Sequence, residues 1–208
     1  MPEQGLLTRM SEDLVLATEP KAALCPRCES GLRARREKIA NRRARSFYDP
    51  GVPDQKPPRL LGGERETLLA LLRYQRESLV RKVAGVDDVA ARRSTVDSGT
   101  TLLWLVKHLA KAEALWMVHR FAGLDDPLPD DAVAPGDTLV AAVAAYRATW
   151  AQVDQVLAVA DLDEPCRRTG DEAPVNLRWV LAHLLEETAR HAGHADILRE
   201  LIDGATGR

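Results

Sequence analysis

The hydrophobic and polar positions divide the chain into two unequal parts. From about residue 61 to the end, apolar residues recur every three or four positions, which is the period of an amphipathic helix. Glycine and proline interrupt this pattern, so it predicts four long helices over residues 64–84, 100–121, 138–160 and 176–202. Almost no stretch alternates as a strand does. Four helices of similar length pack lengthwise, and the pattern therefore predicts an all-α four-helix bundle.

Start and stop signals mark the ends of these helices. Asp137 and Asn176 are the predicted N-caps of the third and fourth helices, because a side-chain oxygen at that position accepts a backbone N–H bond. Gly85, Gly123 and Gly204 follow the first, second and fourth helices, where glycine commonly ends a helix. The connections are about 15 residues long, which exceeds the usual bundle loop. Such a connection either carries functional residues or crosses over the bundle.

The first part of the chain lacks a long amphipathic pattern. We predict a basic, partly disordered N-terminal extension over residues 1–59 and the helical domain over 60–208. Arginines crowd residues 33–45, but without interleaved aromatic residues this run is typical of a solvated face. Cys25 and Cys28 form one CxxC pair, whereas a zinc ribbon needs a second pair and a redox motif needs a βαβ context. The sequence offers neither.

The composition narrows the class of protein. A net charge of −2, with 45% apolar and 29% charged residues, is typical of a soluble globular protein and argues against nucleic acid as a partner. No run approaches the roughly 18 apolar residues of a membrane span, and the N-terminus has no signal pattern. We therefore expect a cytoplasmic protein without a membrane partner. Three cysteines fit a reducing compartment, and Cys166 is interpreted as incidental. Long apolar helix faces also favour a homodimer.

One face of the fourth predicted helix is apolar at both ends and polar in the middle. Its members are Val180, Leu184, Glu187, His191, His194, Leu198 and Leu201. Burying an unpaired carboxylate is costly, so buried charges are normally paired or bound to metal. Glu187 and His191 are one helical turn apart, which lets both side chains reach one ion.

The second predicted helix has a matching anomaly. His108 lies on an apolar face, close in sequence to Trp104 and Leu105. If the second and fourth helices are neighbours, His108 completes a set of two imidazoles and one carboxylate. Such a set binds Zn²⁺ at about 2.0–2.2 Å and leaves a fourth position open, as catalytic sites do. Ni²⁺, Fe²⁺ and Mn²⁺ accept the same donor atoms.

Spacing alone leaves several alternatives open. His119 lies about 16 Å along the helix from His108 and cannot share its ion. We interpret His119 and His183 as core histidines. Glu187 has a second interpretation, as the ion-pair partner of Arg190 or of a cation on another helix. His194, one turn after His191, is a ligand in place of Glu187, a partner of a ligand, or a group that contacts substrate.

Two segments resemble the second and fourth helices of DinB-like proteins. They are residues 99–110, GTTLLWLVKHLA, and residues 186–196, EETARHAGHAD. The openings at 64–69 and 74–76 look like the actinobacterial branch of that superfamily, and the resemblance covers about residues 58–207. The same part of the sequence is also similar to the metal-binding domain of mycothiol-dependent maleylpyruvate isomerase.

The resemblance implies a four-helix bundle with one divalent metal, most often zinc or nickel. In this branch the middle ligand is glutamate, so the family pattern carries over to His108, Glu187 and His191. It further implies a metal-dependent S-transferase that conjugates mycothiol, or a similar low-molecular-weight thiol, to small electrophiles in detoxification. His194 is then the catalytic proton shuttle, because imidazole titrates near neutral pH.

Two other functions fit the same residues. In a metal-dependent hydrolase the open position holds water, and His194 acts as general base. The other is a non-enzymatic, stress-related bundle that binds a metal or sequesters a ligand. Turnover without any added thiol favours the hydrolase, and tight metal binding without turnover favours the binding protein.

Overall fold

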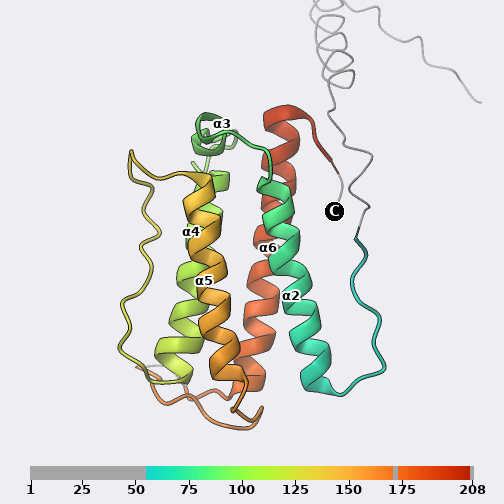
Figure 1. The fold of residues 1–208 in the computed structure, drawn as a ribbon, viewed down its shortest axis with the longest axis vertical. Helices are drawn as coiled ribbons and strands as arrows, with labels where there is room; N and C mark the ends of the chain where they lie inside the picture. Colours follow the sequence, from blue (N-terminus) through green and yellow to red (C-terminus); the bar gives the residue numbers. More distant parts are fainter. Residues whose placement is uncertain (1–54, 171–172, 207–208) are drawn as a thin grey trace, which may run out of the picture. The chain divides into compact units, whose positions relative to one another are not determined.

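A computed structural model describes residues 55–170 and 173–206, and this part of the chain is helical (Figure 1). Its elements are α2 (Glu64–Val83), α3 (Asp88–Arg92), α4 (Leu102–Glu113), the π-helix η1 (Ala114–Phe121), α5 (Leu139–Leu157) and α6 (Leu177–Asp203). The predicted all-α bundle is confirmed. None of the described helices is long and apolar enough to cross a membrane. Most of the predicted extension, with Cys25 and Cys28, lies outside the described residues.

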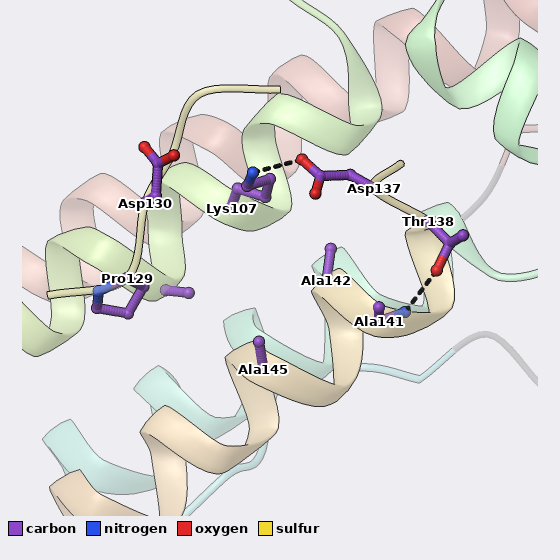
Figure 2. A pocket seen from close by; sticks show the side chains of 9 residues that line it. Lys107, Pro129, Asp130, Asp137, Thr138, Ala141, Ala142 and Ala145 are labelled. Atoms are coloured by element: carbon purple, nitrogen blue, oxygen red, sulfur yellow. Dashed lines mark hydrogen bonds and ion pairs between the residues drawn. The ribbon is translucent and has the colours of Figure 1, made fainter. Parts of the chain in front are cut away.

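The helix starts follow the capping rule. The side chains of Thr101, Thr138 and Asn176 each accept a hydrogen bond from the backbone N–H three residues further on. The prediction of Asn176 as an N-cap is therefore confirmed. The prediction of Asp137 is wrong, because α5 is capped one residue later by Thr138 (Figure 2). The Asp137 carboxylate instead accepts the Ala134 N–H and pairs with a lysine.

The four long helices have an up, down, down, up order along the chain (Figure 1). α2 lies beside α6, α4 lies beside α5, and α4 also packs against α6. Because α4 and α5 run in the same direction, residues 122–138 between them must return along the length of the bundle, as Figure 1 shows. One long connection is thus a crossover. The connection from α2 to α4 contains the short helix α3, which the sequence pattern did not predict.

The crossover, residues 122–138, is called the strap below, and it is fixed at several points. Near its end the Arg92 guanidinium donates to the carbonyl oxygens of Ala134 (2.9 Å) and Pro135 (3.0 Å). Lys107 Nζ of α4 lies 2.5 Å from Asp137 Oδ2 (Figure 2). A cavity of about 310 Å³ between the strap, α4 and α5 is walled on the α5 side by alanines. The strap therefore lies over α4 as a defined structure.

The core consists of two apolar clusters with polar side chains between them. Along α2, Arg76 separates Leu72 of one cluster from Leu79 of the other. The corresponding buried residues of α4, α5 and α6 complete what we call the polar layer, whose members are Arg76, Glu113, Thr149, Thr188 and His191. Most buried polar groups have hydrogen-bond partners, so we expect the side chains of this layer to contact one another across the helices.

An ion pair fills one half of the polar layer. Arg76 Nε and Nη2 donate to Glu113 Oε1 (3.0 Å) and Oε2 (2.5 Å), and both side chains are buried. Tyr146 Oη donates to the same carboxylate at 2.8 Å. Burial raises the pKa of Glu113, whereas the Arg76 guanidinium acts in the opposite direction. The contact connects α2, α4 and α5, and the sequence pattern did not indicate it.

Candidate metal centre

The three side chains singled out in the sequence come together between α4 and α6. His108 Nε2 lies 3.2 Å from Glu187 Oε1, and His191 Nε2 lies 3.1 Å from the same oxygen. One potential ligand atom from each residue lies within 4.8 Å of the other two. The condition set by the sequence, that the second and fourth long helices are neighbours, is therefore met.

Solvent reaches this group, which we call the triad. The side chains of His108, Glu187 and His191 are 25%, 21% and 11% exposed. The Trp104 ring stacks on His108 with centroids 4.6 Å apart and lies edge-on to His191 at 6.1 Å. The indole therefore restricts the orientation of both imidazoles, while the three side chains keep some contact with solvent.

Burial and the contacts among the three side chains together lower the pKa of both Glu187 and His191. Burial raises the pKa of Glu187, but the contacts with His108 and His191 outweigh it, and the pKa ends below the ordinary value. Burial lowers the pKa of His191, although the Glu187 carboxylate opposes that shift. An ionised carboxylate beside a neutral imidazole is the form that a divalent cation requires.

The donor set fits a divalent metal ion better than an ion pair. The alternative partner of Glu187 was Arg190, but Arg190 pairs with Glu186 on the exposed side of α6. In the described part of the chain, Glu187 contacts two imidazoles and no lysine or arginine. Two imidazole nitrogens and one carboxylate oxygen that face a common point are a typical set for Zn²⁺ with an open position.

A carboxylate that the sequence analysis missed stands behind His108. Asp131 Oδ2, on the strap, lies 3.6 Å from His108 Nδ1, the ring nitrogen that faces away from Glu187. Lys111 Nζ lies 2.7 Å from the other oxygen of Asp131 and, as the largest cause, lowers the pKa of that carboxyl. Ligand histidines commonly direct their second nitrogen at a carboxylate. The unusual length of the strap was the only signal in the sequence.

His194 lies behind His191 and does not join the triad. The Nδ1 atoms of the two rings are 3.3 Å apart, and the rings are 5.4 Å apart between centroids. Of the three roles open to His194, this position suits a partner of a ligand or a contact with substrate. Leu201, placed in the apolar stripe by its spacing, is exposed. A strict seven-residue repeat drifts around a straight helix, and α6 is 27 residues long.

The other two histidines also lie outside the triad. His119 is only partly buried, and its Nε2 contacts the carbonyl oxygen of Asp126 at the start of the strap. The interpretation of His119 and His183 as core histidines is therefore wrong for both, because each side chain is only partly buried. His183 is half-buried and stacks on Trp179, with centroids 5.0 Å apart.

A comparison with protein families decides which family this architecture represents. The family model described as mycothiol-S-transferase matches residues 67–204, a range that contains the triad and His194. The chain belongs to the mycothiol-S-transferase family. This membership confirms the DinB-like resemblance drawn from the sequence.

The fold of this mycothiol-S-transferase family member also occurs in a solved structure. The chain is similar to a structure titled as the crystal structure of the conserved protein of locus from Enterococcus faecalis, with a TM-score of 0.52 and 18% identity. The match covers 67% of this chain and 97% of the other. At that identity the likeness concerns the fold alone. No curated protein matches the chain significantly.

Proposed function

We propose that this chain is a divalent-metal-dependent S-transferase that joins mycothiol, or a similar low-molecular-weight thiol, to small electrophiles. The observation that carries the proposal is the convergence of His108, Glu187 and His191 within 4.8 Å in a member of the mycothiol-S-transferase family. A transferase of this kind needs a place where a thiol loses its proton beside an electrophile. The partly exposed triad is such a place.

The proposed ligands are His108 Nε2, Glu187 Oε1 and His191 Nε2. A divalent cation held by these three atoms, with zinc the best match to the donors, would supply a lower pKa to a thiol bound beside it. The thiolate, and not the thiol, is the nucleophile: its sulfur forms the new bond to carbon, and the leaving group of the electrophile, for example halide, departs with the electron pair of the bond that breaks. Trp104 keeps the two imidazoles in place through its ring contacts, and Asp131 faces the second nitrogen of His108.

His194 is the proposed catalytic group for the proton of the thiol. Its side chain is exposed, and its Nδ1 lies 3.3 Å from Nδ1 of His191. An imidazole in this position accepts the proton and hands it on to water, which is the role of a general base. No described cysteine is needed, because the sulfur that reacts belongs to the substrate and Cys166 is buried in the core.

Elemental analysis of the purified protein tests the metal centre. We expect about one divalent metal per chain in the wild type, and its loss in His191→Ala and in Glu187→Ala. Glu186→Ala is the matched control, because Glu186 is the adjacent carboxylate but pairs with Arg190 on the exposed side. A metal-free wild type, purified without chelators, would remove the basis of the proposal.

Conjugation of mycothiol to a chromogenic aryl halide then tests the reaction. We expect turnover that depends on both the thiol and the metal, and that disappears in Glu187→Ala. Turnover of an ester without any added thiol would instead indicate a hydrolase. A full complement of metal without turnover of any electrophile would indicate a binding protein.

A further inference from the structure

The strap that carries Asp131 is held in place mainly by polar contacts. None of residues 122–138 is buried, so little apolar surface fixes their position. The cavity of about 310 Å³ between the strap, α4 and α5 leaves one side of the strap without close packing (Figure 2). Segments with few buried apolar contacts open at a low cost in free energy. The position of Asp131 therefore depends on the groups that hold the strap.

The last residues of the strap form a turn that is closed by its own hydrogen bonds. Ala134 N donates to Asp137 Oδ2 (2.9 Å), and Asp137 N donates to the Ala134 carbonyl oxygen (3.1 Å). Lys107 Nζ lies 2.5 Å from the same carboxylate oxygen and also donates to the carbonyl oxygen of Ala132. Because Ala132 directly follows Asp131, a displacement of the turn displaces Asp131 as well.

Arg92, the last residue of α3, holds this turn. Its guanidinium donates to three carbonyl oxygens of the turn, those of Ala134 (2.9 Å), Pro135 (3.0 Å) and Asp137. A guanidinium presents five donors in a rigid plane, so it can meet three acceptors at once. Within residues 55–170 and 173–206, Arg92 forms no ion pair, and these backbone acceptors are its hydrogen-bond partners.

The short helix α3 is itself well fixed. Ala91 is fully buried in one of the two apolar clusters, and the Asp87 side chain caps the helix by accepting the Ala90 N–H. Asp88 Oδ1 accepts the backbone N–H of Leu139, the first residue of α5, at 2.7 Å. Figure 1 shows α3 at the end of the bundle where the strap joins α5. Arg92 therefore reaches the strap from a rigid part of the fold.

A continuous series of contacts thus runs from α3 to the triad. Arg92 holds the turn, the turn continues into Asp131, and Asp131 Oδ2 lies 3.6 Å from His108 Nδ1. We propose that Arg92 is a positioning residue of the metal centre, which acts on His108 through the strap. This inference rests on the proposed function, because it takes the triad as the metal site. Lys111 also holds the Asp131 carboxylate, so the loss of Arg92 should displace it only in part.

Titration of the metal-free full chain with zinc, in competition with a chromogenic chelator, tests the proposal. We expect Arg92→Ala to raise the Kd of zinc about three- to tenfold, the range for residues that change a coupling without touching the ligand. Arg92→Lys should lie between this variant and the wild type, because one ammonium group does not replace a planar fork. Arg65→Ala is the matched control, since Arg65 also donates to backbone carbonyl oxygens, those of Leu157 and Ala160 after α5. It should retain the wild-type Kd.

A double-mutant cycle separates positioning from a general loss of stability. In the Asp131→Asn background, Arg92→Ala should change the Kd of zinc by less than about twofold, because the contact through which Arg92 acts is already lost. A general structural role would weaken zinc binding by the same factor in both backgrounds. If Arg92→Ala does not fold, Arg92→Lys replaces it in the same cycle.

Hydrogen exchange of the metal-free protein measures the strap directly. In Arg92→Ala, the amides of residues 131–138 should exchange faster than in the wild type, while those of α2 and α6 keep their rates. An unchanged Kd of zinc in Arg92→Ala, or equal weakening in both backgrounds of the cycle, overturns the inference and leaves the proposed function intact. A wild type that binds no zinc contradicts the proposed function and removes the metal from this inference too. The exchange rates distinguish the two failures, because they need no metal.

Discussion

Asp131 Oδ2 lies 3.6 Å from Nδ1 of His108, on the opposite side of the imidazole from Glu187. The strap brings this carboxylate to α4, and Lys111 Nζ holds it there at 2.7 Å. When the Nε2 atom of a histidine binds metal, a carboxylate at Nδ1 fixes the tautomer and the ring orientation. The relationship therefore makes the strap part of the proposed metal centre.

The first prediction concerns Asp131. We expect Asp131→Asn to weaken zinc affinity by about ten- to a hundredfold, because the amide removes the negative charge that lies 3.6 Å from His108 Nδ1. Titration against a chromogenic chelator measures the affinity. Asp130→Asn is the matched control, since Asp130 is exposed and accepts the Ala132 N–H. Equal affinities in the two variants would show that Asp131 does not position the ligand.

His194 is expected to affect turnover and not metal binding. In His194→Gln we predict a metal content equal to that of the wild type and a kcat about a hundredfold lower, the usual contribution of a general acid–base group. Steady-state kinetics and elemental analysis on the same sample separate the two effects. His119→Gln, which changes a histidine outside the triad, should retain kcat. Loss of the metal in His194→Gln would mean that this residue is a ligand.

The buried pair of Arg76 and Glu113 makes a prediction about stability. Removing one partner leaves the other charge buried and unpaired, so Arg76→Met should lower the free energy of unfolding by about 3–5 kcal/mol. The double variant Arg76→Met/Glu113→Leu should recover most of that loss. Urea denaturation measures both. Arg190→Ala, which breaks an exposed pair, should cost less than about 1 kcal/mol. A double variant as unstable as the single one would contradict this account.

Cys166 carries a prediction about pH. Burial raises the pKa of its thiol, with Arg120 acting in the opposite direction. The raised pKa keeps the thiol protonated at pH values where a free cysteine already ionises, about 8.5, and the thiolate is the reactive form. Iodoacetamide should therefore label Cys166 more slowly in the folded protein than in urea, and labelling should accelerate as the pH rises above that range. Peptide mass mapping distinguishes it from the other cysteines.

The same residue tests which sulfur reacts. If the substrate supplies the nucleophile, Cys166→Ala should conjugate mycothiol at a rate within about twofold of the wild type, since the side chain lies outside the triad. Loss of conjugation with an unchanged metal content would assign a covalent role to Cys166 and would contradict the proposed mechanism.

The sequence predicted the features that depend on position along one helix. Glu187 and His191 stood out because they interrupt an apolar stripe, and His108 stood out for the same reason on α4. Asp131 did not, because its approach to His108 depends on the path of the strap through space. Arg76 and Glu113 were missed for a related reason. A charged residue on a helix has the pattern of a surface position until its partner on another helix is known.

Local chemistry also left choices that only the backbone resolves. Asp137 and Thr138 are both good N-caps, and which of them begins α5 depends on which residue has extended backbone angles. Lys107 of α4 pairs with Asp137 of the strap, and the Thr138 side chain accepts the Ala141 N–H at the start of α5. The π-helical geometry of η1 has no comparable signal in its sequence.

The polar layer has a consequence for how the helices can slide past one another. Apolar side chains tolerate such a shift, because one leucine can take the place of another. The Arg76–Glu113 contact joins α2 to α4, Tyr146 joins α5 to the same carboxylate, and His108–Glu187 joins α4 to α6. A displacement of α4 by one turn, about 5.4 Å, would break all three together. The axial alignment that assembles the triad is therefore the one in which Glu113 keeps its buried cation.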